Sequence, residues 1–333
     1  MSRKILITGC AGLIGSSFAR WLLDYTNDEV VGIDDCSCGL RQNIPPGLRW
    51  RELSLGRGHS YRFIAQERPD VVYHLAAYAA ECLSPFVRCY NYQQNVVATA
   101  EVVNACIRCG VERLVFASSA AVYGHAEAPY SETDTPRPMD PYGVAKLACE
   151  HDIRIAGEQH GLGWCVLRPH NVYGPGQSPW QRYRNVFGIW MDRHMRGLPI
   201  QVFGDGQQRR AFTYIDDIME ALYFAGTDPA TNRQTINLGG SQPLSVLDAA
   251  HVLVDVMDGG QIEHVPARHE ARDCWCTTAV SEYLLGYRDR TSLDSGLWAM
   301  WQWVKQATPE RPVLPTPEIT RGMPEYWQVS DSR

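Results

Sequence analysis

The chain has 333 residues, of which 45% are hydrophobic and 20% are charged. This length allows one large domain or two of average size, and the apolar fraction is enough for a sizeable core, which excludes a mainly disordered chain. With 31 basic and 37 acidic residues, the formal charge of −6 gives no overall basic field, so nucleic-acid binding is not expected.

Neither a membrane span nor a secretory leader is predicted. No apolar run approaches the ~20 residues that cross a bilayer, and the start Met1–Thr8 has two basic residues but no signal-peptide core. We therefore expect a cytoplasmic protein that binds no membrane. The eleven cysteines are odd in number, and only Cys106 and Cys109 have C-x-x-C spacing, inside a helical pattern, so we expect reduced thiols and no metal.

The first half of the chain alternates short β-branched segments with longer amphipathic ones, which predicts strands and helices in turn. The predicted strands are Lys4–Thr8, Glu29–Asp34, Asp70–His74, Arg113–Ser118 and Gly163–Arg168, and the predicted helices are Leu13–Tyr25, roughly Pro85–Cys109 and Tyr142–His160. Because these strands are nearly continuous apolar runs, we expect them to be parallel and covered on both faces. The predicted fold class is α/β, a Rossmann-type doubly wound parallel sheet.

The pattern changes after Pro169, and a smaller, irregular C-terminal substrate domain is predicted. Gly, Pro, Trp and Arg are frequent in Val172–Arg210, without clean alternation. Later elements are a strand at Thr235–Leu238 and helices at Leu244–Met257 and Ser292–Lys305, the second with Trp298 and Trp301 on or near its apolar side. The tail from Thr308 has five prolines and is expected to be a poorly structured wrap on the surface. We expect a nucleotide-binding domain at 1–175, rejoined by about 211–240, and a substrate domain at 176–210 and 241–333.

A glycine loop connects the first strand to the first helix. Its spacing is G-x-x-G-x-x-G, over Gly9, Gly12, Leu13, Ile14 and Gly15. Glycines here permit a tight turn and close approach of the backbone to a pyrophosphate, which then lies at the positive end of the helix. The loop therefore predicts dinucleotide binding.

Two acids follow the second strand, about twenty residues beyond this loop. Asp34 is placed to accept hydrogen bonds from the adenosine ribose, and Asp35 is next to it, with no Arg immediately after the strand. Because two carboxylates would repel a 2′-phosphate, NAD is favoured over NADP.

Hydroxyl and amine groups gather after the fourth predicted strand and on the helix that follows it, in a catalytic pattern. Ser119 follows a strand, and Tyr142 and Lys146 are four residues apart on a helix, so they project from one face. A phenol has a pKa of ~10, but a nearby ammonium and the nicotinamide cation would stabilise its phenolate. Tyr142 would then act as a base, and Ser119 would hydrogen-bond the substrate oxygen.

The sequence resembles the extended short-chain dehydrogenase/reductases, specifically the NAD-dependent nucleotide-sugar epimerases and dehydratases, including UDP-glucose 4-epimerases. The resemblance covers nearly the whole chain. It is carried by the glycine loop, Val71–Ala77, Asn95, the Ser119/Tyr142/Lys146 set, Arg168–Gly176, Gly204–Gly206, Arg210 and Asp216–Asp217.

This resemblance implies further site residues. The cofactor would also contact Leu75, Ala76, Ala77, Asn95, Lys146 and His170. The nucleotide diphosphate would be held by Asn171, Asn185, Val186 and Arg210, with either Arg268 or Arg272 as a second contact. The chain departs from its relatives at Ser54, where an Asp often touches adenine, and at Ala211, where an Asp usually follows the arginine.

The residues after the catalytic serine bear on the reaction. Relatives that dehydrate or decarboxylate sugars carry acids there, whereas this chain has Ala120 and Ala121. The resemblance therefore favours 4-epimerisation of UDP-glucose and UDP-galactose through a 4-keto sugar. The alternatives are a dehydrogenase or reductase with exchangeable cofactor, an epimerase or decarboxylase of UDP-uronic acids, and a catalytically silent NAD-binding regulator.

Two finer expectations concern substrate range and assembly. Cys274 occupies a position that in relatives packs against the sugar C2 substituent, and its small thiol would admit N-acetylhexosamines. Relatives pair two long helices in a dimer, and the corresponding segments here are roughly Asn95–Cys109 and Tyr142–His160, so a homodimer is expected.

Overall fold

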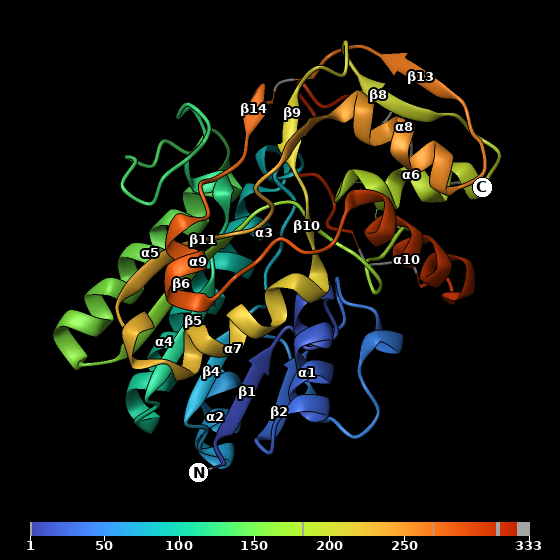
Figure 1. Cartoon of the computed structure of the whole chain (residues 1–333). Coiled ribbons are helices and arrows are strands. Elements are labelled where there is room, and N and C mark those ends of the chain that lie inside the picture. The colour runs from blue at the N-terminus through green and yellow to red at the C-terminus, as the bar shows by residue number, and fades with distance from the viewer. Residues whose placement is uncertain (1, 182, 269, 311–313, 325–333) are drawn as a thin grey trace.

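The computed structural model describes residues 2–181, 183–268, 270–310 and 314–324. Within them, seven parallel strands form one sheet in the order β11-β6-β5-β4-β1-β2-β3 (Figure 1). Their bounds are β1 Lys4–Thr8, β2 Glu29–Asp34, β3 Arg49–Glu52, β4 Val71–His74, β5 Arg113–Ala117, β6 Gly163–Pro169 and β11 Gln234–Leu238. The strand order reverses between β1 and β4, and open α/β sheets bind ligands past the carboxyl ends of their strands at such a point.

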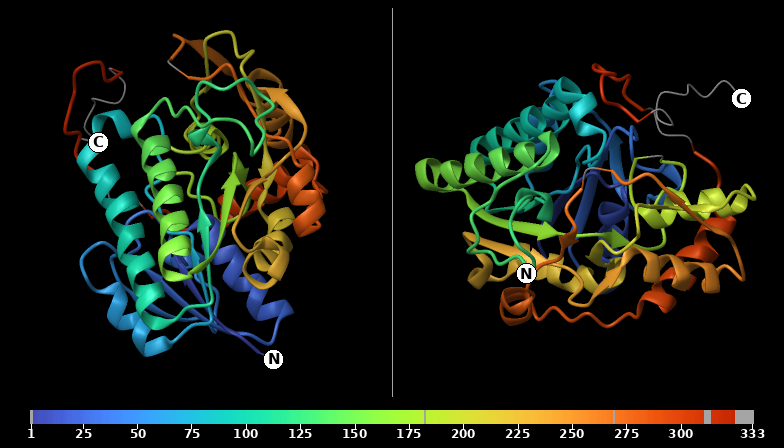
Figure 2. Two further views of the ribbon diagram at one scale, coloured as in Figure 1. Left: turned by 90° about the vertical axis from the view of Figure 1, so that its left-hand side faces the viewer. Right: turned by 90° about the horizontal axis from the view of Figure 1, so that it is seen from above.

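Both faces of the sheet are covered by helices, which gives the doubly wound fold that the sequence predicts. Side chains alternate along β1, so that Ile5 and Ile7 join one apolar cluster while Leu6 joins the other. The covering helices are α1 Leu13–Tyr25, α7 Met219–Thr227 and α9 Ala279–Leu285 on one face, and α2 Ser60–Glu67, α4 Ala98–Cys109 and α5 Pro141–His160 on the other. Helices α4 and α5 lie side by side (Figure 2).

The helix predicted at 85–109 is interrupted in the structure. A short 3-10 turn at Ser84–Phe86 precedes α3, Arg88–Tyr92, and a π-helical turn at Gln93–Val97 joins α3 to α4. Strand β3 and helices α2 and α7 are additional elements that the sequence did not indicate.

A smaller group of elements lies beyond the carboxyl ends of the strands (Figure 1). Its helices are α6 Val186–Met195, α8 Val246–Val256 and α10 Leu293–Gln306, and its short strands are β7 Val172–Tyr173, β8 Ile200–Phe203, β9 Arg209–Ala211, β10 Thr213–Tyr214, β12 Pro243–Ser245, β13 Ile262–Val265 and β14 Asp273–Cys274. The stretch 172–210 is thus more regular than predicted. In α10, Trp301 is buried but Trp298 is 59% exposed, which corrects the expectation for Trp298.

The tail beyond Thr308 includes a segment, 314–324, that packs on the protein. The backbone N–H groups of Glu318 and Ile319 donate to the carbonyl of Phe86, and the Glu318 carboxylate accepts from the N–H groups of Cys89 and Tyr90 at the start of α3. Met323 is buried in an apolar cluster that includes Tyr78 and Leu83. The described tail is therefore a surface wrap, as expected, but one with specific contacts.

All eleven cysteines are free thiols. In the described part of the chain, none of the helices combines the length and the hydropathy needed to cross a bilayer.

Candidate functional site

A cavity of about 1130 Å³ lies past the carboxyl ends of the central strands, between the sheet and the smaller group of elements. Nearly all predicted site residues line it. These are Gly9, Gly12, Leu13, Ile14, Gly15, Asp34, Asp35, Leu75, Ala76, Ala77, Ser119, Tyr142, Lys146, His170, Asn171, Asn185, Val186, Arg210, Arg268 and Cys274. Asn95 and Arg272 do not line it.

The glycine loop has the geometry of a phosphate-binding turn. Gly9 has a φ of +80°, and a Cβ there would lie 2.7 Å from the backbone N of Ala76, so no other residue fits. Gly12 precedes α1 without any side-chain cap, and the first turn of α1 contains no acid. The first N–H groups of α1 are therefore available to an anion, as a pyrophosphate requires.

The two acids after β2 are held by local hydrogen bonds. Asp34 accepts from the N–H groups of Ala11 (2.9 Å) and Cys36 (2.7 Å), and its burial raises the pKa of the carboxyl group. The Ser54 hydroxyl donates to Asp35 (2.9 Å) and does not line the cavity, whereas the leucines on either side of Ser54 do. This part of the cavity therefore offers carboxylates for a ribose and apolar walls for a base.

Helix α5 positions the predicted catalytic pair. Asp140 caps the helix by accepting from the N–H of Gly143 (2.9 Å), and the first turn places Tyr142 in the cavity. Lys146 lies one turn later, and its Nζ donates to the carbonyl of Ala117 (2.7 Å) at the end of β5. Both side chains are buried, at 6% and 2% exposure.

Burial dominates the electrostatics of this pair. It lowers the pKa of Lys146 to about 8. It raises the pKa of Tyr142, and the charge of Glu81 raises that pKa further, while hydrogen bonding by Ser119 and the charge of Arg184 lower it. The groups of the chain alone thus leave the pKa of Tyr142 above its usual value, contrary to the expected effect of Lys146. The positive charge of a bound nicotinamide is the remaining source of the expected lowering.

The strand-end residues after β6 offer further polar groups. The Nε2–H of His170 donates to the carbonyl of Gly240 (2.9 Å), and burial lowers the pKa of His170, so the ring is neutral. Its Nδ1 is a buried acceptor without a partner among the described residues, which fits a donor on a bound cofactor or substrate. Asn171 and Asn185 have φ of 45° and 35°, a region that Asn tolerates, and their amides donate to the carbonyls of Ala211 and Val172.

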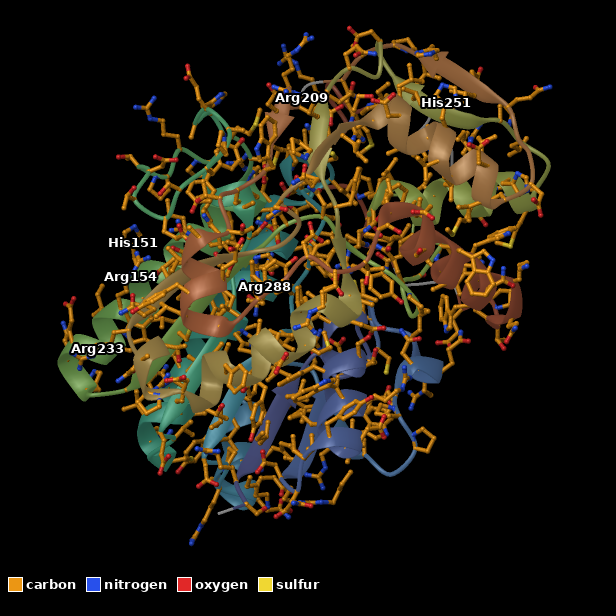
Figure 3. The ribbon with its side chains drawn as sticks, in the orientation of Figure 1. His151, Arg154, Arg209, Arg233, His251 and Arg288 are labelled. Carbon is orange, nitrogen blue, oxygen red and sulfur yellow. The ribbon has the colours of Figure 1, made fainter. Side chains whose placement is uncertain are left out.

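One acid pairs with two of the arginines that line the cavity. Glu270 pairs with Arg210 at 3.0 Å and with Arg268 at 3.2 Å. Of the two arginines predicted as alternatives for the second diphosphate contact, Arg268 lines the cavity and Arg272 is exposed outside it. Arg209, labelled in Figure 3, precedes Arg210 on β9 and is also exposed outside the cavity lining.

Asn95 was predicted to contact the cofactor, but it does not line the cavity and instead supports the loop after β4. It is buried, its Oδ1 accepts from the N–H of Tyr78 (3.0 Å), and its Nδ2 donates to the carbonyl of Tyr78 and to Asn91. Asn91 in turn donates to the carbonyl of Pro141 (3.0 Å) at the start of α5. Asn95 therefore fixes the loop after β4 relative to the catalytic helix.

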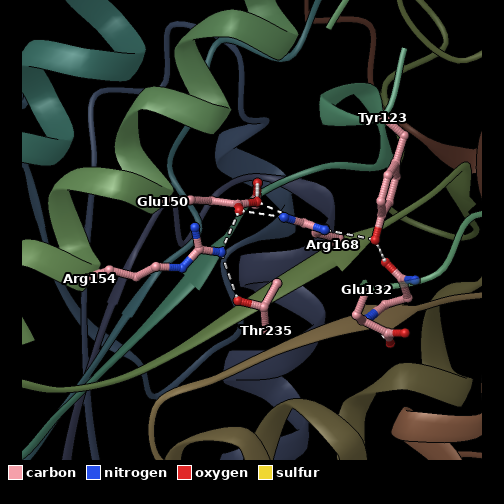
Figure 4. Close-up of polar contacts among 8 residues, drawn as sticks. Tyr123, Glu132, Glu150, Arg154, Arg168 and Thr235 are labelled. Atoms are coloured by element: carbon pink, nitrogen blue, oxygen red, sulfur yellow. Dashed lines mark hydrogen bonds and ion pairs between the residues drawn. The ribbon is translucent and has the colours of Figure 1, made fainter. Parts of the chain in front are cut away.

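A buried polar network beneath the site was not predicted (Figure 4). Glu150 of α5 accepts from Arg168 of β6 (2.7 and 2.9 Å) and from the hydroxyl of Ser118 (2.6 Å). Arg168 also donates to Tyr123, whose hydroxyl donates to Asn237 of β11. Burial alone would lower the pKa of Arg168, but the hydrogen bonds with Glu150 raise it above its usual value. The network joins α5 to the strand ends that carry the site.

Two further charged residues line the cavity without having been singled out from the sequence. Arg184 precedes the cap of α6 and has a buried Nε without a partner among the described residues. Glu81 lies in the loop after β4. The only sequence signal for Glu81 is its place just beyond the carboxyl end of a parallel strand, where such sheets bind ligands.

Comparisons with known proteins agree with this geometry. The match to the family described as "NAD dependent epimerase/dehydratase family" covers residues 5–239. A UDP-glucose 4-epimerase of Azospirillum brasilense is 37% identical over 282 residues, which are 80% of this chain and 80% of that protein. The crystal structure of a Thermus thermophilus UDP-glucose 4-epimerase in complex with NAD superposes with a TM-score of 0.85 at 28% identity, covering 92% of this chain and 100% of that one. A Bacillus cereus UDP-glucuronic acid 4-epimerase, in complex with UDP-glucuronic acid and NAD, gives a TM-score of 0.83 at 29% identity over 91% and 99%.

Proposed function

Since the chain belongs to the NAD dependent epimerase/dehydratase family, we propose that it is a UDP-sugar 4-epimerase that keeps its NAD bound between turnovers. The observation that carries the proposal is the set of side chains around Tyr142. Lys146 and Ser119 line the cavity beside it, while the two positions that bear acids in dehydrating relatives are Ala120 and Ala121, which also line the cavity. The site thus has no acid or base at the two positions that carry them in dehydrating relatives.

In this proposal the two parts of the chain hold different ligands. Residues 1–175, with 211–240, hold NAD through the glycine loop, Asp34 and the backbone at Leu75–Ala77. Residues 176–210 and 241–333 hold the UDP-sugar, since Asn185, Arg268 and Cys274 line the cavity from these segments.

The reaction follows from the chemistry of these side chains. NAD, when bound, supplies the acceptor for the hydride of C4 and returns it. Tyr142 accepts the proton of the C4 hydroxyl, and Ser119 hydrogen-bonds the same oxygen as it becomes a carbonyl. The 4-keto sugar then turns in the cavity, and Tyr142 gives the proton back when the hydride reaches the opposite face. The diphosphate contacts of Arg210 and Arg268 hold the nucleotide while the sugar moves.

The decisive assay uses purified protein with UDP-glucose and no added NAD. We expect NAD to be released on denaturation and UDP-galactose to form at catalytic rates, measured by chromatography. A requirement for added NAD with an oxidised sugar as the product would instead show an exchangeable dehydrogenase, and a requirement for NADH with a reduced sugar would show a reductase.

The sugar pocket is proposed to accept N-acetylhexosamines as well. Cys274 lines the cavity, and a thiol is smaller than a phenol by most of an aromatic ring. We expect wild type to epimerise UDP-glucose and UDP-N-acetylglucosamine, and Cys274→Tyr to lose only the second activity by overpacking. Rejection of the N-acetyl sugar by wild type, or its equal acceptance by Cys274→Tyr, would contradict this assignment.

We also propose a homodimer through α4 and α5. Apolar side chains are exposed on α5 and on the π-helical turn before α4, with Val144 at 42%, Ile155 at 48% and Val97 at 45%. Two such faces related by a two-fold axis would form a four-helix interface that covers them.

A further inference from the structure

The loop after β4 holds Glu81 at a fixed place relative to the catalytic tyrosine. The hydroxyl of Ser84 donates to the carbonyl of Glu81 (2.7 Å) and accepts from the backbone N–H of Tyr142 (3.2 Å). One hydroxyl therefore ties the backbones of the two residues together. Glu81 lines the same cavity as the phenol, and its surface is open to that cavity.

The carboxylate of Glu81 is free to bind a ligand. Among the described residues it has no hydrogen bond and no ion pair within 4 Å, unlike Glu270, which two arginines occupy. A carboxylate carries about four acceptor positions, and those of Glu81 are open to a ligand in the cavity. The free group thus points to a donor on the substrate.

The charge of Glu81 acts on two residues of the predicted sugar site, Tyr142 and Cys274. It adds to the effect of burial in raising the pKa of Tyr142 and that of Cys274. Glu81 therefore lies near both the proton acceptor and the residue proposed to face the C2 substituent, and all three line the cavity. The part of a UDP-sugar that occupies this space is the hexose itself.

We propose that Glu81 is a specificity-determining residue that selects neutral UDP-hexoses against UDP-uronic acids. Its carboxylate accepts a hydrogen bond from a hexose hydroxyl and repels the C6 carboxylate of a uronic acid. This inference rests on the proposed function and narrows its substrates from UDP-sugars in general to neutral UDP-hexoses. Relatives of both classes exist, because the Bacillus cereus neighbour binds UDP-glucuronic acid.

The selection depends on pH because Glu81 can be protonated. The cavity walls around Glu81 desolvate its carboxylate and raise its pKa to about 7, and the negative charge of Asp140 adds to this effect. The other charged groups that act on it are Arg210 and Arg268, which lower that pKa, and Glu270, which raises it. The carboxylate is charged above this pKa, so discrimination against a uronic acid is greatest there and declines as the pH falls through 7.

The test compares kcat/KM for UDP-glucose and UDP-glucuronate in wild type, Glu81→Gln and Glu127→Gln. The control Glu127 loses the same charge but is exposed outside the cavity. Glutamine keeps the shape of the side chain but removes the charge that strengthens a hydrogen bond from a hexose hydroxyl and repels a uronic acid carboxylate. We therefore expect the preference for UDP-glucose to fall at least tenfold in Glu81→Gln and to stay unchanged in Glu127→Gln. In wild type the preference should fall between about pH 8 and pH 6, and in Glu81→Gln it should not.

A binding measurement tests the role of Glu81 independently of turnover. Calorimetry gives the Kd values of UDP-glucose and UDP-glucuronate for Tyr142→Phe and for Tyr142→Phe combined with Glu81→Gln. Absence of turnover in wild type would refute the epimerase, yet a change in the ratio of the two Kd values would still support the role of Glu81. An unchanged ratio, or a wild type that prefers UDP-glucuronate, would overturn the inference even if UDP-glucose is epimerised.

Discussion

Removing the buried acid of the network beneath the site should destabilise the protein without unfolding it. Glu150 is fully buried, and it accepts from Arg168, which is 2% exposed, from Ser118 and from Arg154 (3.0 Å). In Glu150→Gln the shape is kept, but the guanidinium of Arg168 loses its countercharge. Breaking such a pair by removing one partner costs about 3–5 kcal/mol, because the other charge stays buried.

The size of the expected shift in Tm follows from the size of the chain. Unfolding entropy is about 2 cal/mol/K per residue, or about 0.7 kcal/mol/K for 333 residues, so the loss corresponds to a decrease of about 4–7 °C. Circular dichroism on heating measures it, with Glu158→Gln as control, since Glu158 is exposed two turns further along α5. A decrease no larger than that of the control would show that the pair contributes little, and the reasoning would fail.

Three further outcomes are expected. Tyr142→Phe should keep its fold and its bound NAD but lose at least about 99% of turnover, because a general base contributes ~10²–10⁴-fold to the rate. Activity within a few-fold of wild type would refute the role of Tyr142 as the base. Gly9→Ala should purify without NAD, measured by absorbance after denaturation, because its Cβ would meet Ala76 in a backbone conformation with φ +80°. Val144→Asp combined with Ile155→Asp should sediment as a monomer, whereas Tyr283→Asp, an 87% exposed side chain on α9, should not change the mass.

Elements with strong local patterns could be predicted from the sequence, and others could not. The bounds of β1, α1 and β2 agree residue for residue, because buried parallel strands and an amphipathic helix have clear apolar periods. Strand β3, Arg49–Glu52, carries three charged residues, since it lies at the edge of the sheet, and it shows no such period. Helix α6 begins at the cap Asn185 with φ 35° and is held by the buried Trp190, which are tertiary features.

The cofactor half and the substrate half of the site also differ in how far the sequence predicts them. The cofactor half is encoded in contiguous motifs, because a glycine turn and a helix N-terminus bind phosphate through the backbone itself. The substrate half is assembled from side chains that come from separate segments, such as Glu81, Arg184 and Arg268. No local pattern places these side chains together, so the charge that faces the sugar is known only from the fold.

Catalysis and specificity share one support in this fold. Ser84 connects the loop of Glu81 to the backbone of Tyr142, and the carbonyl of Phe86, two residues later, accepts from the tail at Glu318. The tail, the acid-bearing loop and the catalytic helix are thus joined in series by short hydrogen bonds. These hydrogen bonds position the Glu81 loop and take no part in proton transfer. Breaking any of them would therefore shift the carboxylate of Glu81 relative to the hydroxyl of Tyr142. The position of Glu81, and with it the choice of sugar, therefore depends on a tail segment more than two hundred residues away in the sequence.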